Sequence, residues 1–264
     1  MNSPMSFYFR GGKEEPRSSL APWPWQKYPW AHIEIPMGGE WTVSLEKGTL
    51  HVRSDEMLLL KPGVSHSVRK TSDGPMTTIY ALLSWRWRGE DVIAQCRFPT
   101  VLPKDTAEKV LPLIRGLIGN AKQKGLAFAA REQQLGFSLL EIISPHAVHP
   151  LDDALSRDDS RISHALDHID MHWNENIGRR DLAALAGLSP SRFHTVFRNA
   201  TGFSPTAYIT ATRLAHASEM LESTKTSIGD IAAACGFSSV YYFSRCFSAH
   251  KKTTPSAYRN FHRA

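Results

Sequence analysis

Histidine and glutamate side chains in the first third of the sequence carry the donor atoms of a metal site. His32 and Glu34 stand two residues apart, and His66 follows the turn sequence Leu60-Lys-Pro-Gly-Val-Ser. Imidazole nitrogens and carboxylate oxygens that converge can hold a transition metal, which would support metal-dependent catalysis. The same three side chains can instead line a pocket for a small molecule, and we favour this second interpretation.

A second histidine series lies further along the chain. His164, His168 and His172 recur at every fourth position, which places them along one edge of a helix. The apolar residues of this segment, among them Ile162 and Leu166, form a separate stripe. We therefore interpret these histidines as solvated side chains, and we predict no metal, no cofactor and no catalytic residue in the chain.

The last third of the sequence repeats itself at an interval of about 50 residues. The segment Leu-Ala-Ala-Leu-Ala-Gly-Leu-Ser-Pro-Ser-Arg-Phe (182–193) is echoed by Ile-Ala-Ala-Ala-Cys-Gly-Phe-Ser-Ser-Val-Tyr-Tyr-Phe (231–243). In each copy, small apolar residues let two helices cross closely, and a glycine, Gly187 or Gly236, ends the first helix where a positive φ is expected. Each copy therefore predicts a helix-turn-helix.

Several spaced elements of this region resemble the DNA-binding domain of the arabinose-regulator (AraC) family. The resemblance covers 161–264 and implies an all-α domain whose two recognition helices enter successive major-groove segments of duplex DNA. The matching elements are Ala-Gly-Leu-Ser-Pro-Ser (186–191), Phe-Arg-Asn-Ala-Thr-Gly-Phe-Ser-Pro (197–205), Arg-Leu-Ala-His-Ala (213–217), Ser-Ile-Gly-Asp-Ile-Ala (227–232), Gly-Phe-Ser-Ser (236–239), Tyr-Phe-Ser-Arg-Cys-Phe (242–247) and Thr-Pro-Ser-Ala-Tyr-Arg (254–259).

The resemblance assigns the DNA contacts to the exposed faces of the two recognition helices. Arg245 is the foremost base-reading candidate, because arginine can bind guanine O6 and N7 in a bidentate way. Arg198, Lys251 and Lys252 are expected to contact phosphates. The expected DNA-contacting residues are Ser191, Arg192, His194, Thr195, Arg198, Val240, Tyr241, Ser244, Arg245, Lys251 and Lys252.

Two residues depart from the family pattern. Lys252 stands where glycine is usual after the second recognition helix, so we expect a different or strained turn there. Gly178 stands where a hydroxyl cap is usual, so one side-chain cap is missing. Neither departure changes the assignment, although the second copy is expected to hold DNA differently.

The distribution of charge agrees with a nucleic-acid partner for the last third. Lysines and arginines exceed acidic residues by six over the whole chain. From Gly178 to the end there are eleven basic and four acidic residues, a net charge of +7, whereas the remainder has twenty basic and twenty-one acidic residues. Phosphates attract such a region, as an anionic membrane surface would. Three cysteines without C-x-x-C spacing and the lack of an 18-residue apolar run lead us to expect a cytoplasmic protein without a membrane partner.

Upstream of the repeat, the sequence changes from strand-like to helix-like patterns. Residues 1–20 are polar and are expected to form a flexible arm. Short alternating segments separated by turn signals predict a small β-barrel that extends to about residue 100, and apolar residues at helical spacing predict helices over about 104–146. The polar stretch 149–160 predicts a linker. The expected fold class is therefore α+β with two domains, a cupin-like β-barrel with flanking helices over 21–148 and an all-α double helix-turn-helix over 161–264.

The β-region resembles the cupin-like sensor that often precedes this DNA-binding domain. The resemblance rests on Leu-Lys-Pro-Gly-Val-Ser-His-Ser-Val at 60–68. Six tryptophans lie in the first 90 residues, and aromatic faces beside polar groups can stack a sugar or another flat-faced molecule, although the same rings can be core residues. The expected effector contacts are His32, Glu34, Trp41, His66 and Trp85.

These observations predict an effector-responsive transcription activator. We expect a homodimer that binds promoter DNA and a small-molecule effector, a sugar being one option, and that contacts RNA polymerase. One alternative is a constitutive regulator whose β-domain only dimerises. The other is a cupin-type metal enzyme fused to a DNA-binding module, which would require a metal held by His32, Glu34 and His66.

Overall fold

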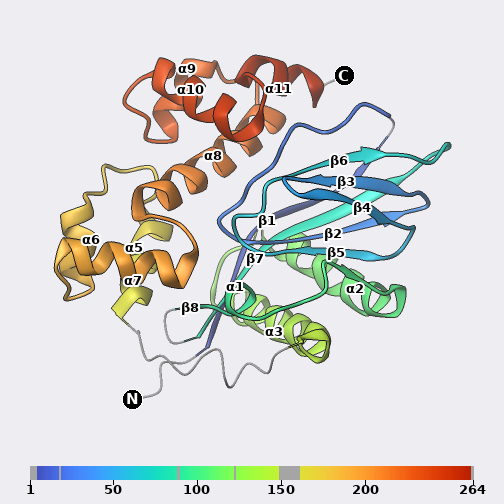
Figure 1. Cartoon of the computed structure of the whole chain (residues 1–264), viewed down its shortest axis with the longest axis horizontal. Coiled ribbons are helices and arrows are strands. Elements are labelled where there is room, and N and C mark those ends of the chain that lie inside the picture. The colour runs from blue at the N-terminus through green and yellow to red at the C-terminus, as the bar shows by residue number, and fades with distance from the viewer. Residues whose placement is uncertain (1–4, 18, 88–89, 122, 149–160, 263–264) are drawn as a thin grey trace.

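The computed structural model of the chain describes residues 5–17, 19–87, 90–121, 123–148 and 161–262. A β-rich N-terminal part with two long helices is followed by a C-terminal part made of helices (Figure 1). The two domains that the sequence predicts are therefore present, and the expected linker over 149–160 lies outside the described residues. No helix of the described residues is long and apolar enough to cross a membrane.

The strands form two antiparallel sheets that face one another. Apolar side chains from both sheets, including Trp41, Val43 and Leu58, fill the space between them. In the larger sheet the order is β1-β7-β2-β5-β9 with β8 paired to β7, and in the smaller sheet it is β4-β3-β6. The strands are β1 (Ser6–Pro16), β2 (Ala31–Met37), β3 (Trp41–Leu45), β4 (Gly48–Val52), β5 (Met57–Leu60), β6 (His66–Lys70), β7 (Thr77–Trp87), β8 (Glu90–Asp91) and β9 (Val101–Leu102).

The cupin-like, antiparallel character of this part is confirmed, but the described strands do not close into one barrel. The two sheets have separate hydrogen-bonded ladders, and an isolated bridge between Gln26 and His66 ties the loop before β2 to β6. Contact between the sheets is made mainly by side chains, as in a β-sandwich.

The expectation of a flexible arm over 1–20 is wrong for residues 6–16. These residues form β1, which pairs with β7 from Ser6 opposite Arg86 to Pro16 opposite Thr77. Phe7 anchors the strand because its ring is fully buried against Trp85. The glycines and charged residues that make this segment look like a loose arm are tolerated because β1 is an edge strand.

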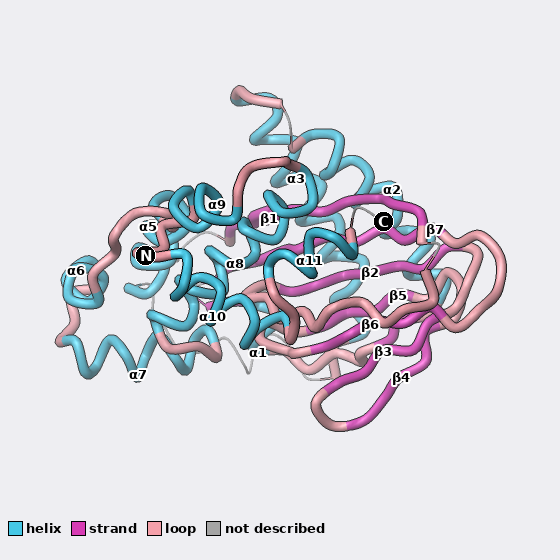
Figure 2. Tube along the Cα trace, turned by 90° about the horizontal axis from the view of Figure 1, so that it is seen from above, coloured by secondary structure: helices cyan, strands magenta, loops and turns pink. Residues whose placement is uncertain are grey.

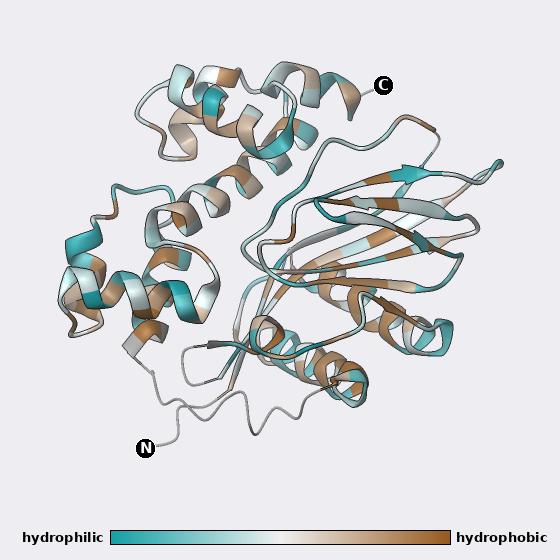
Figure 3. Ribbon diagram, in the orientation of Figure 1, coloured by the Kyte–Doolittle hydropathy of each residue, from teal (hydrophilic) through white to brown (hydrophobic). Residues whose placement is uncertain are grey.

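Two helices cover the outer face of the larger sheet, α2 (Lys104–Asn120) and α3 (Leu126–Ile143) (Figure 1). Their apolar sides pack on alternate strand residues such as Ile33 and Ile79. Figure 3 shows this hydrophobic side of the helices facing the sheet. The short α1 (Val92–Gln95) and the 3-10 helix η1 (Ser144–His146) complete this part.

The C-terminal part consists of two helical units joined by one long helix. One core surrounds Phe193 and Phe197, the other surrounds Phe243 and Phe247, and α8 contributes to both. In Figure 2, α6 and α7 lie at the opposite end of the molecule from β4. The helices are α5 (Arg161–His172), α6 (Arg179–Leu185), α7 (Pro190–Thr201), α8 (Pro205–Ser223), α9 (Ile228–Ala234), α10 (Val240–Lys251) and α11 (Pro255–Phe261).

The turns of the repeat have the backbone conformations that the sequence predicts. Gly187 and Gly236 adopt φ values of 62° and 73°. Gly202 ends α7 with a φ of 75°, and Lys252 ends α10 with a φ of 54°. Lys252 therefore adopts the left-handed conformation that glycine adopts in the first copy, which confirms a strained position for a residue with a Cβ.

Candidate functional sites on the recognition helices and in a polar pocket

The first recognition helix, α7, buries one face and exposes the other. Ser189 caps it by accepting a hydrogen bond from the Arg192 backbone N–H, and Pro190 occupies the first turn. Phe193 and Phe197 point into the core of the unit. Among the predicted DNA contacts, Ser191, Arg192, Thr195 and Arg198 are exposed and His194 is half-buried.

The second recognition helix, α10, has the same organisation. Ser239 caps it by accepting from the Tyr242 backbone N–H. Phe243 and Phe247 face the core, which leaves the opposite side open to solvent. The predicted contacts Val240, Tyr241, Arg245 and Lys252 are exposed, and Ser244 is half-buried. Both helices can therefore present their predicted residues to a major groove.

Lys251 is the exception among the predicted DNA contacts. Its side chain is 1% exposed, and its ammonium donates a hydrogen bond to Gln26 Oε1 in the N-terminal part. In this arrangement Lys251 cannot reach a phosphate. The repeat could have indicated this burial. At an offset of 50, Lys251 corresponds to Thr201 of the first copy, and Thr201 is also buried.

The histidine series on α5 does not form a metal cluster. The rings of His168 and His172 lie 4.5 Å apart, and His172 Nδ1 is 2.9 Å from Glu175 Oε1. Over the described ranges, no group of three or more histidine, cysteine, aspartate or glutamate side chains is placed to hold a metal ion.

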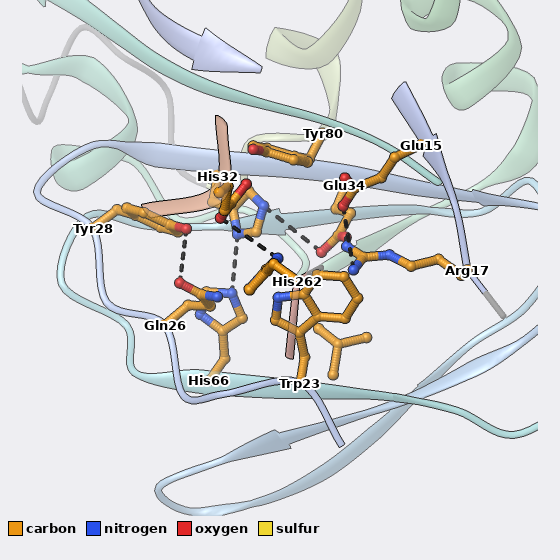
Figure 4. Close-up of a pocket in the computed structure, with 12 residues that line it drawn as sticks. Glu15, Arg17, Trp23, Gln26, Tyr28, His32, Glu34, His66, Tyr80 and His262 are labelled. Carbon is orange, nitrogen blue, oxygen red and sulfur yellow. Dashed lines mark hydrogen bonds and ion pairs between the residues drawn. The ribbon is translucent and has the colours of Figure 1, made fainter. Parts of the chain in front are cut away.

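A polar pocket lies between the two sheets and the C-terminal helices (Figure 4). The space left between its lining side chains is about 30 Å³, the volume of about one water molecule, so a larger ligand requires the lining to move apart. Because His32 and Glu34 alternate with Ile33 and Ile35 along β2, their side chains point into the pocket while the isoleucines face the outer helices. The lining residues are Glu15, Arg17, Trp23, Gln26, Tyr28, His32, Glu34, His66, Val68, Tyr80, Glu222 and His262.

Three of the five predicted effector contacts come together in this pocket. His32 Nδ1 lies 3.0 Å from His66 Nε2, and His32 Nε2 lies 3.7 Å from Glu34 Oε2. His66 Nδ1 lies 3.2 Å from the Val64 carbonyl oxygen. This geometry fits a chain in which His66 donates to Val64 and His32 donates to His66. His32 Nδ1 and both ring nitrogens of His66 therefore have hydrogen-bond partners within the protein.

The other two predicted contacts, Trp41 and Trp85, do not line the pocket. Trp85 lies on the face of β7 that packs on the outer helices, and its indole Nε1 donates to the Gly136 carbonyl oxygen at 2.8 Å. Trp41 is buried between the two sheets among aliphatic side chains. Both rings are core residues, so the expectation that they contact an effector is wrong for this structure.

Burial sets the charge state of the pocket. Desolvation lowers the pKa of His66 to about 4 and holds the pKa of His32 well below its ordinary value. Desolvation also raises the pKa of Glu34 to about 7, although the Arg17 guanidinium opposes this shift. At neutral pH both histidines are uncharged, and Glu34 is divided between its acid and carboxylate forms.

Arg17 is a pocket residue that sequence reasoning missed. It is 7% exposed, its Nη2 lies 3.3 Å from Glu34 Oε1, and its guanidinium lies 3.1 Å from the centroid of the Trp23 ring. Among the residues that line the pocket, Arg17 Nε, Arg17 Nη1 and His262 Nε2 are buried without a hydrogen-bond partner, although Nη1 lies 3.3 Å from Glu15 Oε1. A ligand with acceptor oxygens would satisfy such groups.

Two further pocket residues belong to the helical part. Glu222 lies near the end of α8, and His262 directly follows α11. The rings of Trp23 and His262 lie 4.7 Å apart, edge to face, so the second helix-turn-helix unit closes one side of the pocket. No periodic pattern in the sequence links these residues to β2, because their proximity arises only when the two parts pack together.

Comparison with known families supports the division of the chain into two domains. Residues 23–140 match the AraC-like ligand binding domain, and residues 182–260 match a helix-turn-helix domain. The lactose operon transcription activator of Staphylococcus xylosus is 25% identical over 236 residues, which cover 86% of this chain and 83% of that protein. The regulatory protein PocR of Salmonella typhimurium is 35% identical over 101 residues, only 33% of its length.

Solved structures show the same fold over nearly the whole chain. Apo ToxT from Vibrio cholerae, in a variant form, has a TM-score of 0.62 at 13% identity and covers 97% of each chain. ToxT with an unsaturated fatty acid bound has a TM-score of 0.59 at 13% identity and covers 98% of this chain and 96% of that one. Identity at this level establishes the fold alone. The two family matches together place the chain among the AraC-type transcription regulators, with a ligand-binding domain followed by a helix-turn-helix DNA-binding domain.

Proposed function

We propose that the chain is an effector-responsive transcription activator that reads adjacent major-groove segments with α7 and α10. The base-reading residues in this proposal are Ser191, Arg192, His194 and Thr195 on α7, and Val240, Tyr241, Ser244 and Arg245 on α10. Arg198 and Lys252 bind phosphates. Most of these side chains are exposed on two capped helices in the most basic third of the chain, and His194 and Ser244 are half-buried, which supports the proposal.

The observation that carries effector control is the shared lining of the pocket. His32, Glu34 and His66 come from the ligand-binding domain, whereas Glu222 and His262 come from the DNA-binding domain. A molecule that contacts both sets has an affinity that depends on how the two domains are arranged. Its binding must therefore shift the balance between arrangements. The same argument favours a regulator over an enzyme, since Glu222 and His262 of the DNA-binding domain line the pocket.

The effector in this proposal is a small molecule with several hydroxyl or carbonyl oxygens, such as a sugar. The unpartnered Arg17 Nε and His262 Nε2 can donate to such oxygens, and the carboxylates of Glu15 and Glu34 can accept from hydroxyls. A panel of mono- and disaccharides, lactose included, can be tested through the shift in thermal unfolding. A sugar that binds should raise Tm, and Glu34→Gln should weaken that shift.

We further propose that the protein acts as a homodimer and contacts RNA polymerase. The name of the Staphylococcus xylosus relative, a transcription activator, supports activation. Sedimentation equilibrium of the full chain with and without DNA tests the dimer. Transcription in vitro with purified polymerase tests activation.

DNA selection followed by competition tests the central proposal. Duplexes selected from a random pool by the wild type should share two base-pair motifs, one for each recognition helix. Arg245→Ala should reduce affinity for the selected duplex by about 1–3 kcal/mol and relax the preference at one position. Arg69→Ala is the control, because Arg69 is exposed on β6 in the ligand-binding domain. A pool that yields no shared motif would contradict sequence-specific recognition.

A further inference from the structure

Lys251 is a charged residue of the second recognition helix that is buried against the ligand-binding domain. Its ammonium donates to Gln26 Oε1 and lies 4.7 Å from the centroid of the Tyr28 ring. The centroid of the Tyr258 ring is 5.7 Å away. Lys251 therefore joins the last turn of α10 to the loop that precedes β2.

The partners of Lys251 are themselves residues of the pocket. Gln26 and Tyr28 both line it, and the Tyr28 hydroxyl donates to Gln26 Oε1 at 2.8 Å. The Gln26 backbone exchanges two hydrogen bonds with the His66 backbone, with N–O distances of 2.7 and 3.0 Å. The backbone of Gln26 is thus held beside His66, and its side-chain oxygen accepts hydrogen bonds from both Tyr28 and Lys251.

The fold of a helix-turn-helix unit does not require a lysine at this position. In the first copy the equivalent residue is Thr201, whose hydroxyl donates to the Phe197 carbonyl oxygen at 2.8 Å within its own unit. A buried ammonium is costly unless it is paired. The lysine of the second copy finds its hydrogen-bond acceptor in the other domain, which indicates a role between the domains.

We propose that Lys251, through its contacts with the pocket residues Gln26 and Tyr28, transmits occupancy of the pocket to the second recognition helix, α10. The proposal rests on the proposed function, since it presumes that the pocket takes an effector and that α10 binds DNA. A ligand that takes the Gln26 oxygen releases the end of α10, and a change in α10 on DNA alters the pocket through the same contact.

The energetics near neutral pH suit an exchangeable contact. Desolvation lowers the pKa of Lys251 to about 7, while the nearby Glu222 carboxylate favours the charged form. The Lys251 ammonium is therefore close to the balance between its charged and neutral forms. A change in the polarity of the pocket can then make or break the contact.

The test is hydrogen–deuterium exchange of the full chain, first without DNA. Lys251→Thr installs the residue of the first copy, and Gln26→Met removes the acceptor from the other side. Each variant should accelerate exchange on the order of tenfold both in residues 22–30 and in α10, because the contact between them is lost. Lys225→Thr is the matched control, since Lys225 is exposed in the loop before α9. If Lys251→Thr fails to fold, Gln26→Met tests the same contact.

The second arm adds a duplex selected from a random pool by the wild type. DNA binding should change exchange in residues 22–30 of the wild type and of Lys225→Thr at least twofold, and should leave that segment unchanged in Lys251→Thr and Gln26→Met. Wild-type-like exchange of the variants without DNA would overturn the contact. A DNA-induced change that persists in both variants would overturn the transmission. If the wild type selects no DNA motif, the proposed function is wrong. The inference about Lys251 is then wrong as well.

Discussion

Arg86 on β7 and Asp170 on α5 form a buried ion pair across the boundary between the two domains. Arg86 Nη2 lies 2.5 Å from Asp170 Oδ2, and the two side chains are 3% and 7% exposed. Arg86 Nη1 also pairs with Asp167 at 3.0 Å. The guanidinium therefore holds the first helix of the DNA-binding domain against the larger sheet.

Replacing Arg86 with methionine should cost roughly 3–5 kcal/mol of stability, because Asp170 would be left as a buried charge with one partner fewer. Urea unfolding followed by fluorescence would measure the loss. Lys104→Met is the control, because Lys104 and Asp55 form a solvent-exposed pair whose removal should leave stability nearly unchanged. Equal effects of the two changes would contradict a structural role for the buried pair.

Glu34 should make stability fall as pH rises through the neutral range. Its pKa is about 7 in the folded chain and ordinary in the unfolded chain, so the folded chain holds more protons between about pH 4.5 and 7. Stability is then greatest below this window and decreases across it, by about 3 kcal/mol at most. Glu34→Gln should flatten the decrease. The difference in unfolding free energy between variant and wild type, at pH 5 and pH 7.5, measures the effect, and an identical difference at both pH values would refute it.

The two lysines at the end of α10 should differ in their effect on salt dependence. Lys252 is exposed and is proposed to bind a phosphate, so Lys252→Gln should reduce the slope of log affinity against log salt by about 1. Lys251 is buried, so Lys251→Gln should leave the slope unchanged. Titrations with one selected duplex at several salt concentrations provide the comparison. A reduced slope for Lys251→Gln would mean that this side chain reaches DNA in the complex.

Alanine at the two turn glycines should distinguish conformational strain from steric overlap. Gly187 and Gly236 both have positive φ, which costs an alanine about 1 kcal/mol or more. A Cβ on Gly187 would meet no atom within 4 Å, whereas a Cβ on Gly236 would overlap the Asn174 carbonyl oxygen. Gly236→Ala should therefore be the more destabilising change by at least about 1 kcal/mol, as measured by thermal unfolding. Equal losses would show that the backbone near Asn174 moves easily.

Local patterns account for what the sequence predicts well. Caps, turn glycines and buried phenylalanines make their contacts within one helix-turn-helix unit. The residues near Ser189 and Gly236 are therefore sufficient to predict the two units. His32 and Glu34 share one face of a strand for the same local reason. The alternation that orients them also places their neighbours on the opposite face.

What the sequence does not reveal depends on contacts between distant segments. Arg17 and Gln26 lie in a loop without periodicity, and Glu222 reaches the pocket only because α8 packs beside it. The sequence predicts that Trp85 contacts an effector, but the register of β7 places Trp85 on the outer face of the sheet. Burial of Lys251 likewise depends on packing between the domains, although its pairing with Thr201 in the repeat could have indicated it.

The buried ion pair and the Lys251 contact also bear on experiments with protein fragments. A fragment that carries only α5 to α11 would uncover Asp170 and Lys251, which the intact chain keeps from water. Its second recognition helix would no longer be held by Gln26. DNA affinity measured on such a fragment would therefore describe a surface that the whole protein does not present in this arrangement. It should not be taken as the DNA affinity of the intact protein with effector bound.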